Sequence, residues 1–349
     1  MEISVHNQEK AKELLSQIVV ADLHLDLPGE LLYRHKNGEK SVIQRKYLPA
    51  WKAAGMHLLG ASVYIEDECL PDGGFENAME QIVALQEEMT GTDVFLVRCR
   101  ADLQRAYQGN GIGIILYMEG LDFIKSREDI SLLEQLWKQG VRGASLTWSR
   151  DNVLARGCCR ASENKAVYGG ITPVGLCVIE EMKRLHMFLD ISHMNDDGIR
   201  DILEKAELPV LATHSNARSV CAHYRNLTDE QLTTLSQRQG IAGLNACMLL
   251  TGAAGNRSQP IEALVEQITY LRNRMGEKQV CLGLDLCDRY EAAECEWKAC
   301  KPPMGQDSLV GHEELYILVA ALLENGWSEE QLCNMLGKNA FTFLEKALP

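Results

Sequence analysis

The sequence lacks the segments that would direct a protein to a membrane or out of the cell. No apolar run approaches the roughly 18–20 residues that span a bilayer. The N-terminal segment does not have the basic-then-apolar order of a signal peptide, and the C-terminal segment has no hydrophobic tail for a lipid anchor. From these absences we expect a cytoplasmic protein that does not associate with membranes.

Other absences narrow the class of protein. The 12 cysteines include no Cys-x-x-Cys pair, so a zinc ribbon is disfavoured, and without an export signal we expect reduced thiols rather than disulfides. A formal net charge of -14 and the lack of a Lys/Arg-rich block argue against nucleic acid or anionic lipid as partners. No internal repeat and no long Pro/Gly/Ser linker divides the chain, which predicts a single domain over residues 1–349.

Short apolar runs alternate with helical patterns along nearly the whole chain. These runs predict strands at 18–23, 57–64, 112–118, 143–147, 187–191, 209–213, 240–245 and 280–284. The clearest helices are predicted at 174–186, 228–237 and 328–347, and the last two open with the Ser/Thr-x-x-Gln spacing of a capping box. This alternation favours an α/β fold, a closed (β/α)8 TIM-like barrel. A doubly wound open sheet is the alternative, although it would gather its site at one switch point.

Acids and histidines directly follow five of the predicted strands. They are His24 and Asp26 after the first strand, Glu119 after the third, His193 after the fifth, His214 after the sixth and Asp285 after the eighth. The carboxyl ends of barrel strands meet at one mouth, so these side chains should lie together. His24 and Asp26 are two residues apart and can share one face, and a buried Glu119 would need a partner. Imidazoles and carboxylates suit zinc, so the pattern predicts a metallohydrolase with one or two divalent ions.

The remaining segments are less informative. The polar stretches 286–312 and 154–170 each follow a predicted strand, and either could shape the barrel mouth or form a solvated excursion. We expect a lid at 286–312 in particular. The other histidines have no such placement. We expect His57, which opens a predicted strand, at the bottom of the barrel or in the core, and the rest on loops or helix surfaces, namely His6, His35, His186, His223 and His312.

Longer motifs resemble the membrane dipeptidase (renal dipeptidase) family over nearly the entire chain. The matching segments are His24-Leu25-Asp26-Leu27-Pro28, Glu119-Gly120, Asp190-Ile191-Ser192-His193, and the stretches 209–218, 223–229 and 283–285. The resemblance implies an eight-stranded α/β barrel with two zinc ions, other divalent metals being alternatives. It also implies a zinc dipeptidase in which a metal-bridging hydroxide hydrolyses the peptide bond of a small dipeptide substrate, and a homodimer.

The same resemblance implies a role for each ligand. His24, Asp26 and Glu119 would bind the first zinc ion. Glu119, His193 and His214 would bind the second, so that Glu119 bridges the pair.

It also implies the residues that act on the substrate. Asp285 matches the acid beside the bridging water and, with Glu119, would be catalytic, while Arg225 matches the arginine that holds the substrate carboxylate. One position departs from the family. Where mammalian members carry a Thr-His pair, this chain has Thr147-Trp148, so Trp148 would line the substrate pocket without supplying an imidazole.

Two other functions stay open at this stage. Barrel metallohydrolases share their metal chemistry across many substrates, so the chain could be a metal-dependent amidohydrolase acting on an N-acyl amino acid, a lactam or a lactone. It could also be a catalytically weak homologue that binds metal or peptide.

Overall fold

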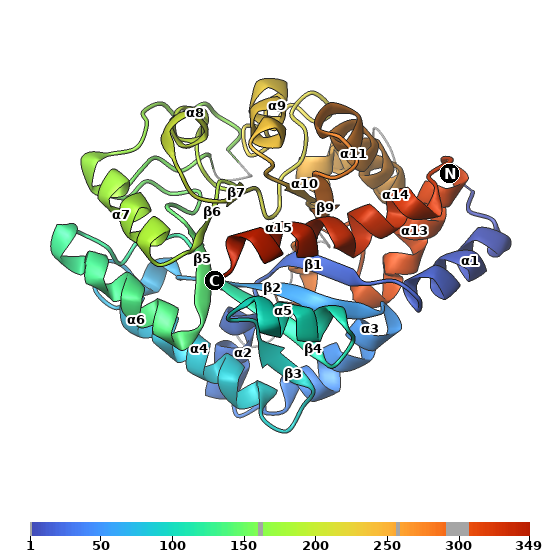
Figure 1. Cartoon of the computed structure of the whole chain (residues 1–349), viewed down its shortest axis with the longest axis horizontal. Helices are drawn as coiled ribbons and strands as arrows, with labels where there is room; N and C mark the ends of the chain where they lie inside the picture. Colours follow the sequence, from blue (N-terminus) through green and yellow to red (C-terminus); the bar gives the residue numbers. More distant parts are fainter. Residues whose placement is uncertain (1, 160–162, 256–258, 291–306) are drawn as a thin grey trace.

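Parallel strands form a nearly closed barrel with helices around it (Figure 1). The computed structural model describes residues 2–159, 163–255, 259–290 and 307–349. Its strands are β1 (Val20–Leu25), β2 (Met56–Tyr64), β3 (Val94–Leu96), β4 (Ile112–Glu119), β5 (Val141–Ser145), β6 (Phe188–Asp190), β7 (Val210–Leu211), β8 (Ala242–Leu244) and β9 (Val280–Leu282).

The strand order closes the ring. Neighbours pair in the order β7-β6-β5-β4-β2-β1-β9-β8, and an isolated parallel bridge between Ala212 and Ala242 joins the two ends. The predicted α/β barrel is therefore confirmed, and each predicted strand is present. The sequence did not predict β3, a strand of 3 residues that pairs only with β4 outside the ring.

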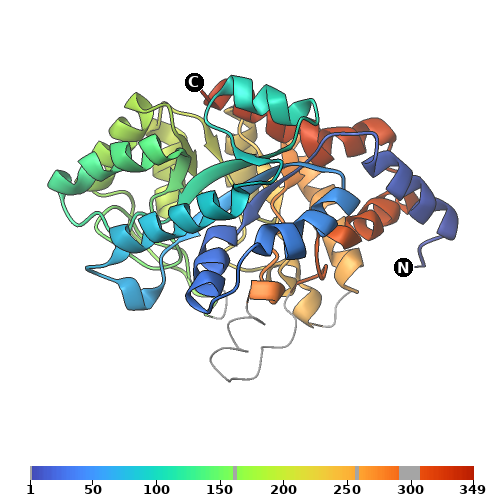
Figure 2. The ribbon, with the colours of Figure 1, turned by 90° about the horizontal axis from the view of Figure 1, so that it is seen from below.

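Helices pack around the strands. They are α1 (Val5–Leu15), α2 (Leu27–Lys36), α3 (Leu48–Ala53), α4 (Gly74–Met89), α5 (Arg100–Tyr107), α6 (Leu132–Gln139), α7 (Pro173–Arg184), α8 (Asp196–Lys205), α9 (Asp229–Gln237), α10 (Met248–Thr251), α11 (Pro260–Met275), α13 (Leu315–Glu324), α14 (Glu329–Cys333) and α15 (Asn339–Ala347). The helix α1 packs against α13, which lies near the other end of the chain (Figures 1 and 2).

Two predicted helices match closely and one is corrected. The segments 174–186 and 228–237 correspond to α7 and α9, and the capping box at the start of α9 is present. The segment 328–347 begins with its capping box but is not one α-helix, because a π-helical turn at Asn334–Lys338 separates α14 from α15. Within this turn Gly337 packs against β1 so closely that an added Cβ would lie 2.2 Å from the carbonyl oxygen of Val19.

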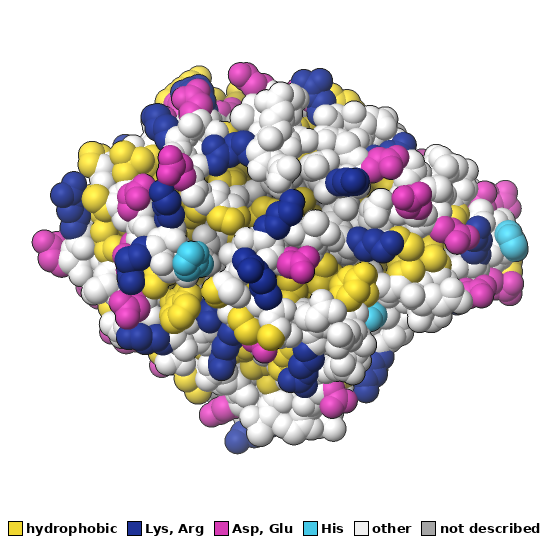
Figure 3. All heavy atoms as spheres, in the orientation of Figure 1, with side chains coloured by type: hydrophobic (Ala, Val, Ile, Leu, Met, Phe, Trp, Pro, Cys, Tyr) yellow, Lys and Arg dark blue, Asp and Glu magenta, His cyan; other side chains and the backbone are white. Residues whose placement is uncertain are grey.

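The helix α15 covers one end of the barrel (Figure 1). Apolar side chains of α15 belong to a buried cluster, among them Ala340, Phe341, Phe343 and Leu344. The cluster also contains side chains of the barrel strands, namely Ala21, Leu23, Leu58, Ile115, Tyr117, Phe188, Leu211 and Cys281. On the outer face seen in Figure 3, Lys and Arg side chains are interspersed with Asp and Glu, as on a solvated surface. Because α15 closes one end of the barrel, the site must lie at the other end, where the strands have their C-terminal residues.

Two further expectations concern a membrane-spanning helix and the lid. Among the described residues, no helix combines the length and the apolarity needed to cross a membrane. The expected lid at 286–312 lies largely outside the described residues, which exclude 291–306. The lid and the single domain over 1–349 both stay predictions.

The packing of α15 gives a test of the fold. We expect Leu344→Ala to lower the free energy of unfolding by about 2–5 kcal/mol, because this fully buried side chain fills the closed end of the barrel. The shift of the urea unfolding midpoint measures the effect. Thr342→Ala, on the exposed side of the same helix, is the control and should change the free energy of unfolding by less than about 0.5 kcal/mol. Equal midpoint shifts for the two variants would contradict this packing.

Candidate metal centre

The six acids and histidines predicted at strand ends meet at the C-terminal mouth of the barrel. His24 lies in β1, Glu119 ends β4, and the other four lie in the loops or helix starts that follow β1, β6, β7 and β9, namely Asp26, His193, His214 and Asp285. The structure therefore brings together residues that are far apart along the chain.

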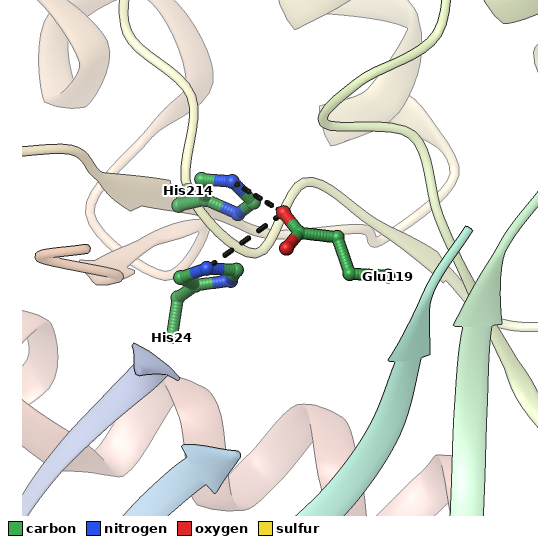
Figure 4. A group of neighbouring side chains, drawn as sticks. All are labelled: His24, Glu119 and His214. Atoms are coloured by element: carbon green, nitrogen blue, oxygen red, sulfur yellow. Dashed lines mark ion pairs between the residues drawn. The ribbon is translucent and has the colours of Figure 1, made fainter. Parts of the chain in front are cut away.

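The carboxylate of Glu119 lies at the centre of the group. Its Oε1 is 2.9 Å from Nε2 of His193, 3.3 Å from Nε2 of His214 and 3.7 Å from Nε2 of His24. Figure 4 shows the imidazoles of His24 and His214 facing the same oxygen. All four side chains are buried, so these contacts are made away from bulk water.

The other ring nitrogen of each imidazole is held by a hydroxyl. Nδ1 of His24 contacts the hydroxyl of Tyr117, which itself donates to the carbonyl oxygen of Leu23 at 3.2 Å. Because that hydroxyl donates to Leu23, it accepts a hydrogen from Nδ1 of His24, and Nε2 is the nitrogen left to bind a metal ion. Nδ1 of His193 lies 2.9 Å from the hydroxyl of Ser149.

The orientation of His214 is fixed in the same way. The hydroxyl of Thr213 donates to Oδ2 of Asp190 at 2.6 Å and lies 2.7 Å from Nδ1 of His214. The buried Asp190 also accepts from the hydroxyl and the backbone N–H of Ser192. The lone pair of Nε2 in His214 therefore also points at Glu119. Such outer hydrogen bonds are what orient imidazoles in metal sites.

Two more carboxylates complete one side of the group. Oδ1 of Asp26 and Oδ1 of Asp285 lie 3.6 Å and 3.4 Å from Nε2 of His24. The side-chain amide of Asn245 donates to Oδ2 of Asp285 at 2.9 Å. The backbone of Asp285 is left-handed, with φ +56°, a conformation that is uncommon for residues with a Cβ, although Asp adopts it more readily than most.

The electrostatics of the group favour a bound cation. Burial raises the pKa of Glu119 well above its ordinary value, and burial lowers the pKa of His193 and His214 well below theirs. Burial would also lower the pKa of His24, but Glu119 and Asp285 outweigh it and raise the pKa to about 10. The acids therefore stabilise positive charge at this point, while two imidazoles stay neutral and able to donate lone pairs.

The donor set fits a divalent metal. Two overlapping groups of three residues place their ligand atoms within 4.8 Å of one another: His24, Glu119 and His214, and His24, Asp26 and Asp285. Imidazole nitrogen combined with carboxylate oxygen is typical of zinc sites. The residues present could therefore hold one or two such ions.

Arg225 and Trp148 lie beside His193 on the other side of the group. The guanidinium of Arg225 is buried; Nη1 donates to the hydroxyl of Ser215 and Nη2 lies 3.0 Å from Nε2 of His193. The indole of Trp148 stacks on the ring of His193, with centroids 5.6 Å apart and planes 27° apart. Tyr64 packs on Trp148 with centroids 5.0 Å apart. These aromatic rings form a wall of the site.

Sequence reasoning missed the residues that hold the ligands in place. The hydroxyls and amide described above follow no motif: Tyr117, Ser149, Thr213 and Asn245. His223 lies in a loop, as expected, although it is buried, whereas the expectation that His312 lies on a loop or helix surface is wrong, because it is buried in a 3₁₀ helix at His312–Glu314. Nε2 of His312 lies 2.8 Å from Oδ2 of Asp22, whose Oδ1 accepts from the backbone N–H of Leu284. The spacing of Asp22 two residues before His24 could have indicated Asp22.

Comparison with known proteins identifies the family of this chain. A family model described as membrane dipeptidase (peptidase family M19) matches residues 8–348. The chain belongs to this family. Among curated relatives, a Klebsiella pneumoniae protein described as uncharacterized is 33% identical over 53% of this chain, and human dipeptidase 3 is 25% identical over 95% of it. This chain spans 69% and 65% of the lengths of these two proteins.

Solved structures share the fold. A metallopeptidase from Rhodobacter sphaeroides, solved with a phosphinate mimic of L-Ala-D-Ala, is 24% identical, with a TM-score of 0.81, and the match covers 95% of this chain and 99% of that one. A dipeptidase of the M19 family matches at 25% identity and a TM-score of 0.81, over 95% of this chain and 98% of that one.

The hydroxyl that holds His193 gives a test of the metal centre. We expect Ser149→Ala to weaken binding of a divalent metal about 10–100-fold, because Nδ1 loses the partner that orients the ring. Competition against a chromogenic chelator measures the affinity, and thermal unfolding shows whether the fold is intact. Ser131→Ala, at an exposed position, is the matched control. An unchanged affinity in the Ser149 variant would contradict an orienting role.

Proposed function

We propose that this chain is a binuclear zinc dipeptidase that hydrolyses the peptide bond of dipeptides. The single observation that carries the proposal is the buried Glu119 carboxylate, which three imidazole Nε2 atoms approach within 3.7 Å. The two comparisons most relevant to it are proteins described as a metallopeptidase bound to a dipeptide mimic and as a dipeptidase of the same family.

The ligand roles are those that the family resemblance implies, and the contacts of Glu119 support them. His24 and Asp26 would hold one ion, His193 and His214 the other, and Glu119 would bridge them, since its Oε1 contacts histidines from both sets. Zinc ions held in this way lower the pKa of a bound water toward about 7 and polarise a carbonyl.

Arg225 supports a substrate with a free carboxylate close to the bond that is broken. Its guanidinium is buried beside His193, and a planar fork of N–H donors suits bidentate contact with a carboxylate. A carboxylate bound there lies next to the ligands themselves, so the bond presented for hydrolysis is the last peptide bond of the substrate. This arrangement favours a dipeptide whose C-terminal residue reaches Arg225.

Asp285 is placed to move protons. Oδ2 accepts from the side-chain amide of Asn245, and Oδ1 accepts from the thiol of Cys287 at 3.2 Å and lies 3.4 Å from Nε2 of His24, toward the centre of the group. In that position the carboxylate accepts the proton of the attacking water and passes it to the leaving amine. Trp148 stands where mammalian relatives carry a histidine, and its contacts with His193 and Tyr64 make it a wall of the substrate pocket and not a proton donor.

The function is tested with a panel of dipeptides, assayed with and without zinc. We expect turnover by the zinc-loaded protein, and we expect Asp285→Asn to lower kcat by about 10²–10⁴-fold, since proton transfer is lost. Atomic emission spectroscopy checks that the variant keeps its metal, and Asp72→Asn at an exposed position is the control. The same panel includes N-acyl amino acids, a lactam and a lactone. Faster hydrolysis of one of these than of every dipeptide would replace the proposal with the amidohydrolase alternative.

The role of Arg225 has its own test. We expect Arg225→Lys to lower kcat/KM for dipeptides by about 10–100-fold, because lysine cannot form the bidentate contact. Dipeptide amides lack the carboxylate, so the same substitution should change their kcat/KM little. Equal losses on acids and amides would show that Arg225 supports the fold of the site without binding the substrate carboxylate.

A further inference from the structure

A cavity of about 200 Å³ adjoins the metal centre on the side of β1 and β2. Asp26 and Ser62 line it and also contact each other, so they form the wall that it shares with the ligand group. The rest of the lining comes mainly from α2 and α4, which pack against each other. Nothing in the function proposed above uses this space.

A buried acceptor without a partner faces the cavity. Gln81 is 2% exposed, and its side-chain amide nitrogen donates to the carbonyl oxygen of Tyr64 and to Oδ1 of Asn77. Its Oε1 has no hydrogen-bond partner among the described residues. This oxygen would lie 3.6 Å from a Cβ built on Gly29, which lines the same cavity. A buried carbonyl oxygen in this state is destabilising, so the cavity suits a ligand that donates N–H.

The lining of the cavity is also acidic, which suits a positively charged donor. Besides Asp26, which is proposed to bind the metal, Glu66 and Glu68 contribute two carboxylates to the cavity. Glu66 is fixed by the hydroxyl of Tyr290, which donates to Oε1 at 3.1 Å. Lys36 is the one cation in the described lining, and it is paired at 2.8 Å with Glu80, which does not line the cavity. The lining therefore favours a cation.

The cavity and Arg225 lie on opposite sides of the mouth. In the ring of eight strands, β2 and β7 are separated by four steps in either direction, since the order is β1-β2-β4-β5-β6-β7-β8-β9. Arg225 contacts the loop after β7 through Ser215, whereas Ser62 and Tyr64 of β2 line the cavity. A dipeptide whose carboxylate binds Arg225 thus directs its first residue toward the cavity.

We propose that this cavity binds the side chain of the first residue of the substrate and selects a side chain that ends in an ammonium or guanidinium group, as in lysine, ornithine or arginine. The inference rests on the proposed dipeptidase function and names the substrate class within it. Gln81 accepts from the cationic head, and Glu66 supplies the opposite charge.

The charge preference is tested with two substrates of nearly equal shape. We expect kcat/KM of the zinc-loaded enzyme to be at least about tenfold higher for Lys-Ala than for norleucyl-Ala, which lacks the charge. Glu66→Gln should reduce this ratio by about tenfold, because it keeps the shape of the side chain and removes its charge. Glu76→Gln, at an exposed position of α4 that does not line the cavity, is the matched control and should leave the ratio unchanged.

The position of the subsite is tested separately by size. In Gly29→Ala the added Cβ would lie 3.6 Å from Oε1 of Gln81 and 3.7 Å from the hydroxyl of Tyr290, which are ordinary contacts, so the fold should be intact. The methyl group occupies space inside the cavity. We expect kcat/KM for Lys-Ala to fall by about tenfold while that for Gly-Ala changes much less. Equal losses on both substrates would contradict this location.

A binding measurement separates the two proposals. Calorimetry compares lysinamide with norleucinamide on the zinc-loaded enzyme and on the Glu66→Gln variant. If no dipeptide is hydrolysed but lysinamide binds more tightly and Glu66→Gln abolishes the difference, the proposed function fails and the cationic subsite stands. If dipeptides are hydrolysed but neither assay distinguishes lysine from norleucine, the subsite is overturned and the function stands.

Discussion

The burial of one carboxylate determines how the mouth of this barrel is built. Glu119 ends the strand β4, is 2% exposed, and would be costly to bury without partners. The imidazoles of His24, His193 and His214 supply those partners from three other strand ends. Each imidazole is in turn held by a hydroxyl at Nδ1, so the orientation of the group is set by residues that never touch its centre.

This dependence explains what the sequence could and could not predict. The strands, and the six acids and histidines that follow five of them, were predictable because an apolar run followed by an acid or histidine is a local pattern. The supporting residues were not, because Thr213 matters only through its contact with Asp190 and His214, which the fold creates. His312 is the extreme case, since its partner Asp22 lies 290 residues away along the chain. Local patterns also gave no indication of β3 or of the π turn that divides the last predicted helix, because both are set by packing against neighbouring strands.

The two sides of the mouth differ in charge. Arg225 lies by the ends of β6 and β7 as a buried cation, whereas Asp26 and Glu66 face the cavity by β1 and β2. For the dipeptide proposed above, these charges would favour one orientation, with its carboxylate at Arg225 and its first residue at the cavity.

The position of α15 has a consequence for biosynthesis. The barrel interior is sealed by Phe341, Phe343 and Leu344, which the ribosome adds after every strand has been made. Until then the apolar ends of Leu23 and Leu58 face water or other nascent segments. Completion of the interior must therefore wait until α15 has left the exit tunnel.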